Sequence, residues 1–247
     1  MASFFNTKLI KIEETSSTND FAYELLKKGK IKEGAVIFSQ FQKKGKGQRG
    51  AKWESEYGKN ILMSIVLSPD ILVVNQFQLN VCISLALHDF SKKYFLEKTK
   101  IKWPNDLLIE NEKLAGILIK NIVKEDKIKY AIVGIGININ QINFDEFSLK
   151  ATSFKKLIDK NFDVLELQKE LLIYIENRYL QLKQESFVKM RKEYLKHLFA
   201  FNDWRNYKIS EKEIKARIVG IDEDGRILLE FENNNLKAFS LKEIAFL

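Results

Sequence analysis

The sequence of 247 residues predicts an α+β fold, with a mixed central sheet, helices and a small terminal β region. Two observations predict it. The segment "DLLIENEKLAGILIK" folds back at Asn111 and Glu112, which places a hairpin in a sheet that also receives long helices. After Asp203, short apolar strands alternate with turns such as "DEDG", as in a small barrel. We therefore expect domains at residues 1–203 and 204–247.

Local patterns account for the individual elements. Ser17 and Thr18 mark the start of the first helix and Gly29 marks its end, because hydroxyls cap helix N-termini and glycine caps C-termini. Apolar residues at helical spacing predict further helices over residues 74–96 and 152–200. The expected strands include "TKLIKIEE", "GAVIFSQ", "NILMSIVL" and "YAIVGIGININ".

The composition, 45% hydrophobic and 30% charged, is typical of a folded globular protein. No apolar run is long enough to span a bilayer and no signal-peptide pattern is present, so we expect a cytoplasmic protein without a membrane partner. The single cysteine, Cys82, excludes an internal disulfide. His88 and His197 lie far apart along the chain, each in a helical pattern, which argues against zinc sites and Ser-His-Asp chemistry.

The loop "QKKGKGQRGAKW" joins three glycines and five cations without an acidic residue. The net charge of +8 makes nucleic acid the first candidate partner, but no aromatic residue is interleaved between Gln42 and Lys52. The spacing is not that of a nucleotide P-loop, and a strand follows it instead of a helix. Glycines 45, 47 and 50 let successive amides point inward, so the loop suits a smaller anion.

The strand "VGIGININ" places Gly134, Gly136, Asn138 and Asn140 on one face. Two glycines there leave a bare floor on which either a ligand or a closely packed helix can lie. The asparagines favour a ligand, because amides buried in a dry helix interface would need partners.

The segment "KWPND" is the second indication of a site. Pro104 disfavours helical geometry at Trp103, so the segment should present Asn105 and Asp106 at the head of the next strand. Lys113 follows the hairpin turn, where a cation would meet a carboxylate or phosphate. An ordinary turn aspartate and a solvated lysine are the alternative interpretations.

Taken together, "SSTND", "QKKGKGQRGAKW", "KWPNDLLIENEKLAGILIK" and "GIGININ" resemble the biotin protein ligase family over nearly the whole chain from Ile12 onward. The combination of "KWPND" with "KLAGIL" at this spacing is the most specific part. The resemblance implies a catalytic domain like that of class II aminoacyl-tRNA synthetases and biotin synthetases, followed by an SH3-like barrel.

The resemblance also implies a two-step reaction with ATP and Mg²⁺. The biotin carboxylate would attack the α-phosphate to give biotinyl-5′-AMP and pyrophosphate. Biotin would then pass to one lysine of a biotin carboxyl carrier protein domain, in acetyl-CoA carboxylase or a related carboxylase. The basic loop would close over the adenylate and exclude water, which hydrolyses a mixed anhydride.

Matching motif positions gives the site residues that the resemblance implies. The biotin contacts would be Ser17, Thr18, Asn19, Gln42, Lys46, Gly47, Gln48 and Lys113. The nucleotide contacts would be Gly45, Arg49, Trp53, Asn60, Asn105 and Asn138. Lys113 would offset the repulsion between two anions, and is a catalytic candidate together with Asp106. Asp106 would orient that lysine, hold Mg²⁺ through water, or accept the amine proton; no direct metal ligand is assigned.

Departures from the family pattern bear on these expectations. Where the family usually reads GRGR, this chain has Lys46 and Gln48, and lysine lacks the bidentate grip of arginine, so looser retention of the adenylate is expected. About a dozen residues precede the first matched segment, so we expect no helix-turn-helix domain and no sequence-specific DNA binding.

Other functions and assemblies remain open at this point. A lipoate or octanoyl ligase or transferase of the same fold is the nearest alternative, although its arginine-rich loop and histidine are missing from the sequence. A basic nucleic-acid-binding protein is the alternative from another class. A homodimer through a sheet edge is a further expectation.

Overall fold

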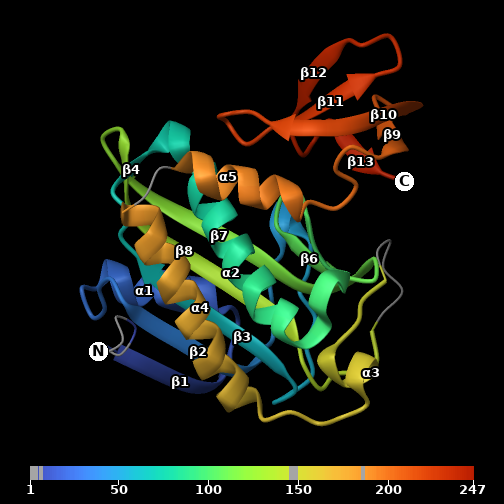
Figure 1. Cartoon of the computed structure of the whole chain (residues 1–247). Coiled ribbons are helices and arrows are strands. Elements are labelled where there is room, and N and C mark those ends of the chain that lie inside the picture. The colour runs from blue at the N-terminus through green and yellow to red at the C-terminus, as the bar shows by residue number, and fades with distance from the viewer. Residues whose placement is uncertain (1–4, 6–7, 145–149, 185–186) are drawn as a thin grey trace.

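The computed structural model describes residues 5, 8–144, 150–184 and 187–247. Its centre is an eight-stranded sheet in the order β1-β2-β3-β8-β7-β6-β5, with β4 paired to β8 (Figure 1). β1 and β2 are parallel and the other neighbours are antiparallel, which confirms the expected mixed sheet. The strands are β1 (Lys8–Thr15), β2 (Ala35–Gln42), β3 (Asn60–Leu67), β4 (Ile71–Leu72), β5 (Thr99–Lys102), β6 (Asp106–Ile109), β7 (Glu112–Lys124) and β8 (Lys127–Asn138).

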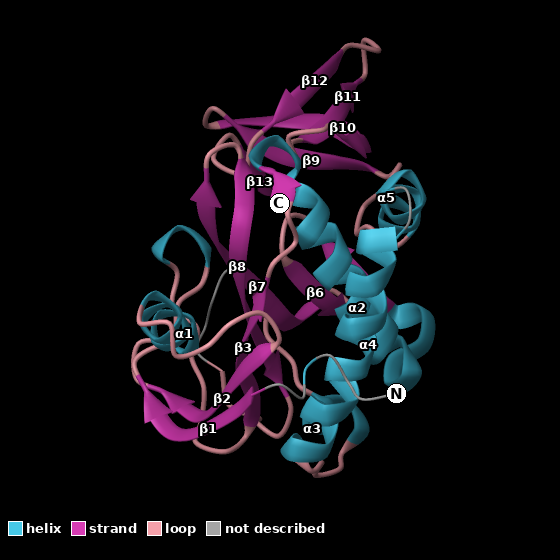
Figure 2. Ribbon diagram, turned by 90° about the vertical axis from the view of Figure 1, so that its left-hand side faces the viewer, coloured by secondary structure: helices cyan, strands magenta, loops and turns pink. Residues whose placement is uncertain are grey.

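Helices cover the two faces of this sheet unequally, as Figure 2 shows in side view. One face carries the short helix α1 (Thr18–Lys27). The opposite face carries two long helices, α2 (Phe77–Phe95) and α4 (Val164–Gln184), and two shorter ones, α5 (Phe187–Lys196) and α3 (Phe154–Ile158). Single 3₁₀ turns occur at Gln48–Gly50, Val73–Asn75 and Leu96–Lys98.

Strand β3 is buried at every position because helices lie on both sides of it. Its side chains alternate between two apolar clusters. Met63 and Ile65 join the large cluster under α2 and α4, whereas Val66 joins a small cluster under α1 together with Ile132 of β8. The large core therefore lies on one side of the sheet, and the other side has room for a site.

A second, five-stranded antiparallel sheet begins at Trp204, next to the expected boundary, in the order β12-β11-β10-β9-β13. Its strands are β9 (Trp204–Ile209), β10 (Lys212–Ile221), β11 (Ile227–Phe231), β12 (Leu236–Phe239) and β13 (Ile244–Phe246). The division into two domains and the closure of this sheet as an SH3-like barrel stay predictions.

Contacts at the turn between β10 and β11 help to fasten the second sheet to the main body. The indole Nε1 of Trp103 donates a hydrogen bond of 2.9 Å to the carbonyl oxygen of Gly225. Gly225 has a φ of +83°, and a side chain there would overlap the ring of Phe77 at the start of α2. The turn between β10 and β11 therefore packs directly against the sheet and helix that flank the "KWPND" segment.

Several sequence expectations needed adjustment. The helix expected over residues 74–96 begins at Phe77, and the strand β5 was not expected, because only four residues, two of them lysines, form it. His88 and His197, far apart in sequence, stack with ring centroids 3.9 Å apart. Within the described residues no helix is long and apolar enough to cross a membrane.

Candidate active site

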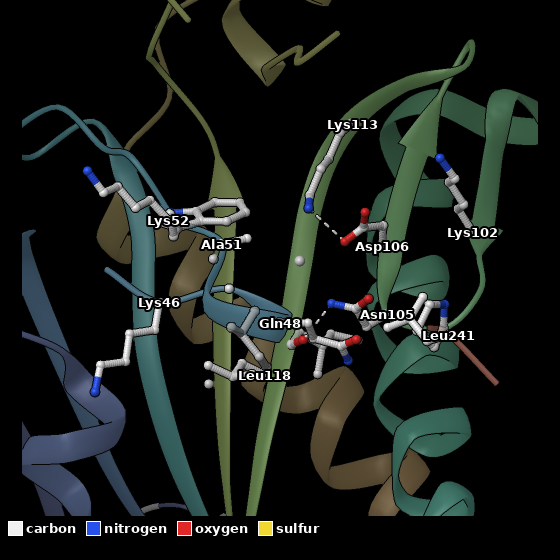
Figure 3. Close-up of a pocket in the computed structure, with 18 of the residues that line it drawn as sticks. Lys46, Gln48, Ala51, Lys52, Lys102, Asn105, Asp106, Lys113, Leu118 and Leu241 are labelled. Atoms are coloured by element: carbon white, nitrogen blue, oxygen red, sulfur yellow. Dashed lines mark hydrogen bonds and ion pairs between the residues drawn. The ribbon is translucent and has the colours of Figure 1, made fainter. Parts of the chain in front are cut away.

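A cavity of about 330 Å³ lies on the α1 side of the sheet, beneath the basic loop (Figure 3). Its walls come from the start of α1, the loop, strands β5 to β8 and the end of the second sheet. Of the residues expected at the site, it brings together Ser17, Thr18, Asn19, Gln42, Lys46, Gly47, Gln48, Trp53, Asn105, Asp106 and Lys113.

One row of paired residues forms the middle of the pocket wall. Lys102 of β5 pairs with Asp106 of β6, which pairs with Gly116 of β7, which pairs with Gly136 of β8. Directly paired residues in a sheet project from the same face. The row therefore presents a cation, a carboxylate and two bare positions side by side.

A β-bulge brings Lys113 onto the same face. Gly116 and Lys113 are three residues apart, so in a regular strand they would point to opposite faces. The register shifts between Leu107 and Leu108, so that Lys113 pairs with Leu108 and lies on the face of Asp106. The extra residue in β7 thus decides which side of the sheet receives the lysine.

Lys113 and Asp106 form an ion pair, with 2.7 Å between Nζ and Oδ1 (Figure 3). Asp106 Oδ1 is buried against this ammonium, and a carboxylate has about four acceptor sites, so Asp106 can still accept from a further partner. The two side chains are 28% and 18% exposed, so solvent screens the pair only in part. A pair of this kind can hold an anion at the lysine and a proton or a hydrated cation at the aspartate.

The glycine floor is covered by an indole rather than left open. A Cβ on Gly136 would overlap the Trp53 ring, and one on Gly116 would lie 3.1 Å from Trp53 Cζ3. The indole Nε1 is buried without a hydrogen-bond partner. The expected bare floor therefore exists, and an aromatic ring of the basic loop rests on it.

The other end of the floor is closed by α1. Asn19 lies over Gly134, where a Cβ would come within 2.6 Å of Asn19 Oδ1. Its amide donates to the Leu118 carbonyl oxygen at 2.9 Å and accepts from the Ser64 hydroxyl at 2.7 Å. The helix interpretation of the glycine-bearing strand thus holds at Gly134, whereas Gly136 faces the Trp53 ring of the loop, and a ligand on this strand stays a prediction.

Hydrogen bonds at the start of α1 orient Gln42. The hydroxyl of Ser17 caps the helix by accepting from the Asp20 amide at 3.5 Å. Thr18 donates twice to Gln42 Oε1, from its amide at 2.8 Å and from its hydroxyl at 3.1 Å. The carbonyl of Gln42 is therefore occupied, which leaves its NH₂ group as the donor facing the pocket.

The cations of the basic loop turn away from the floor. Lys46 Nζ lies 2.6 Å from Asp20 Oδ2, Lys43 pairs with Glu14, and Lys52 points outward in Figure 3. The side chain of Arg49 lies outside the described part of the chain. Inside the described pocket, the cations beside the floor come from the sheet instead.

Among the expected nucleotide contacts that the structure describes, three do not line the cavity: Gly45, Asn60 and Asn138. Asn60 accepts from the Ile139 amide at 3.1 Å, and Asn138 donates to the Thr152 carbonyl oxygen at 3.0 Å. The side chain of Asn140 likewise bonds the main chain of Phe162, donating to its carbonyl oxygen and accepting from its amide. The asparagines that favoured a ligand therefore satisfy main-chain groups, and a nucleotide role for Asn60 and Asn138 stays a prediction.

The sequence interpretation missed several lining residues. Lys102 and Trp103 precede the proline of "KWPND" and could have been included from that motif. Four others come from the C-terminal end of the second sheet, where no local pattern marks them: Leu241, Ile244, Ala245 and Phe246. No group of three or more His, Cys, Asp or Glu side chains suited to a metal ion occurs in the described part of the chain.

The fold and the pocket define an α+β enzyme whose site can bring anionic groups together. The chain belongs to the biotin/lipoate A/B protein ligase family, whose model matches residues 12–138. It is 29% identical over 235 residues to the bifunctional ligase/repressor BirA of Bacillus subtilis, covering 94% of this chain and 72% of that protein.

Two further relatives extend the comparison. The biotin–[acetyl-CoA-carboxylase] ligase of Mycobacterium tuberculosis is 29% identical over 174 residues, covering 69% of this chain and 63% of that one. The biotin protein ligase of Aquifex aeolicus, solved in complex with biotin and ATP, superimposes with a TM-score of 0.78 at 27% identity. That superposition covers 97% of this chain and 98% of the other, so the second sheet is included.

Proposed function

We propose that the protein activates biotin with ATP as biotinyl-5′-AMP and transfers it to a lysine of a biotin carboxyl carrier protein domain. The observation that carries the proposal is the Lys113–Asp106 ion pair, set beside a glycine floor in the pocket beneath the basic loop. The Aquifex aeolicus relative, which holds biotin and ATP, supports the choice of substrates. A cytoplasmic location is part of the proposal.

In the first step a carboxylate oxygen of biotin attacks the α-phosphorus, and the bond from that phosphorus to the pyrophosphate oxygen breaks. Both reactants are anionic, so the barrier includes their mutual repulsion. Lys113 Nζ, partly screened from water, offsets that repulsion by roughly 1.5–3 kcal/mol, the scale of a charge-assisted hydrogen bond. In the second step the acceptor amine attacks the acyl carbon, and AMP departs with the electron pair of the acyl–oxygen bond.

Asp106 has a role in each step. Its ion pair with Lys113 fixes the position of the ammonium before the substrates arrive. The capacity left on its carboxylate lets it accept the proton that the acceptor amine must lose. A positioning role and a proton-accepting role are compatible, because the two events occur in different steps.

The biotin end of the pocket is set by Gln42 and Ser17. A ureido ring has one carbonyl acceptor and two N–H donors. Because Thr18 occupies Gln42 Oε1, the Gln42 amide donates to the ureido carbonyl, and the Ser17 hydroxyl accepts from a ureido N–H. Trp53 moves with the basic loop and shields the adenylate from water.

The pocket also fits Mg²⁺ carried by the nucleotide. Asp106 is the one carboxylate among the described lining residues. Mg²⁺ in nucleotide sites uses one or two carboxylates, with phosphate oxygens and water as its other ligands, so Asp106 is the residue that would hold it. When bound, the ion would supply positive charge that offsets the charge of the phosphates.

The test is biotin-dependent exchange of labelled pyrophosphate into ATP. Lys113→Ala should lower the exchange rate by roughly tenfold or more, because one charge-assisted hydrogen bond is lost. Lys124→Ala is the matched control, since Lys124 is an exposed lysine at the far end of the same strand. Near-normal exchange in folded Lys113→Ala would remove Lys113 from its role, and exchange driven by lipoate instead of biotin would overturn the substrate.

A further inference from the structure

Lys102 is a pocket cation for which the reaction above has no use. Its side chain lines the cavity from β5 and is half-buried. Within the described residues, no carboxylate oxygen lies within the 4.0 Å of an ion pair from its ammonium, although Asp106 is its direct cross-strand neighbour. A half-buried ammonium without a counter-ion is costly unless an anion joins it.

The charges across the wall do not balance. Lys102, Asp106 and Lys113 come from three adjacent strands and lie on one face. Lys113 is already paired with Asp106 at 2.7 Å, so the row carries one surplus positive charge, at Lys102. Figure 3 shows the Lys102 ammonium on the far side of Asp106 from Lys113. The surplus charge is therefore next to the reacting centre rather than at it.

The second sheet holds this ammonium in place. Lys102 Nζ lies 5.0 Å from the ring centroid of Phe246 in β13. Burial lowers the pKa of Lys102 below its ordinary value, while Asp106 acts in the opposite direction and Lys113 adds to the lowering. An ammonium that is partly desolvated and held near an aromatic ring can form a strong charge-assisted hydrogen bond with an oxyanion.

We propose that Lys102 binds the pyrophosphoryl end of ATP and the pyrophosphate that leaves. The inference rests on the proposed function and adds a subsite to it. When the bond between the α-phosphorus and the bridging oxygen breaks, the electron pair stays on pyrophosphate, and Lys102 stabilises this growing charge. The two loop cations that line the described pocket do not supply that charge in this arrangement, because Lys46 is paired with Asp20 and Lys52 points outward.

The experiment compares Lys102→Met with Lys100→Met in the pyrophosphate exchange assay. Lys100 lies on the same strand and the same face as Lys102, and it does not line the pocket. Lys102→Met should raise the KM for pyrophosphate about tenfold or more, the loss expected for one charge-assisted contact, and leave the KM for biotin within about twofold. Lys100→Met should change neither, and Lys102→Arg should restore most of the pyrophosphate affinity.

Direct binding provides an independent readout. Calorimetry with biotin-free protein, in which no adenylate can form, should give weaker affinity of Lys102→Met for ATP and for inorganic pyrophosphate, and unchanged affinity for AMP. Equal weakening of AMP and ATP would overturn the subsite, as would an unchanged KM for pyrophosphate. A change confined to the KM for the carrier domain would also overturn it and assign Lys102 to the acceptor.

The outcomes separate the two levels of the proposal. If the unmodified protein shows no biotin-dependent exchange, the proposed function fails. If it exchanges normally and Lys102→Met keeps its KM for pyrophosphate, only the subsite fails. Should Lys102→Met not fold, as judged by circular dichroism, Lys102→Gln in the same assays decides the question, because it keeps a polar side chain without the charge.

Discussion

The two faces of the central sheet are stabilised by different means. On the α2 face, bulky apolar side chains from four helices and the sheet form one large core, with Phe90 and Phe154 among its fully buried rings. On the α1 face, a small apolar cluster gives way to glycines covered by Asn19 and Trp53, with an ion pair beside them. Where a sheet face loses bulk, hydrogen bonds and charges set its shape. Changes there should therefore affect chemistry more than stability.

The largest expected effect would come from truncating a ring on the α2 face. Phe90 is fully buried and contacts Tyr94, Phe154 and Tyr174 edge-on or tilted. Phe90→Ala should lower the free energy of unfolding by about 3–5 kcal/mol, measured by urea denaturation, while kcat of the folded fraction stays unchanged. Ile173→Ala, at a position 58% exposed on α4, is the control and should change stability by less than about 0.5 kcal/mol.

Gly134→Ala should have an intermediate effect, and it should change both stability and substrate binding. The new Cβ would lie 2.6 Å from Asn19 Oδ1 and displace an amide that bonds Ser64 and Leu118. We expect a loss of about 1–3 kcal/mol in the free energy of unfolding and a raised KM for biotin. Gly220→Ala places its Cβ 3.4 Å from Leu228, in tolerable contact, and should be close to neutral. Unchanged biotin affinity in Gly134→Ala would contradict the claim that changes on the α1 face affect chemistry more than changes on the α2 face.

A polar pair on the apolar side makes stability depend on pH. Burial, with a smaller contribution from His88, lowers the pKa of His197 from 6.5 to about 4. The His197 of the unfolded chain therefore binds a proton more tightly than that of the folded chain. The contribution of neutral, buried His197 to the free energy of unfolding is fully present above pH 6.5, and it is lost as pH falls from 6.5 towards about 4. Urea denaturation at pH 7.5 and pH 5 should give a smaller difference for His197→Phe than for the unmodified chain, and equal differences would contradict the assignment.

The smallest expected effect concerns the basic loop. Lys46→Arg combined with Gln48→Arg restores the planar, charged pattern of the family and should slow release of the adenylate severalfold. The stability change should stay below about 1 kcal/mol, because the Lys46–Asp20 pair is half exposed, 54% and 43%. Adenylate release is measured by trapping labelled biotinyl-AMP on a filter. If the unmodified protein releases it no faster than the double variant, these two departures have no consequence.

Much of the pocket was predictable because short motifs carry its chemistry. Asp106, Lys113 and the residues from Ser17 to Asn19 were expected from "KWPND", "KLAGIL" and "SSTND", and all of them line one cavity. The sequence was less informative where one residue type can either bind a ligand or bond the main chain. Asn138 and Asn140 are polar residues in a glycine-rich strand, and only their bonds to Thr152 and Phe162 reveal main-chain partners.

The sequence by itself determined most of the longer helices and strands and the motif residues of the pocket, but not short elements such as β5, because capping, periodicity and turn chemistry act over a few neighbouring residues. Tertiary structure alone decided that a bulge turns Lys113 towards Asp106, that Trp53 lies on the glycine floor, and that Phe246 backs Lys102. It also stacked His88 on His197. Each of these depends on which strands and helices become neighbours. That choice is made by burial and pairing between segments far apart in the chain.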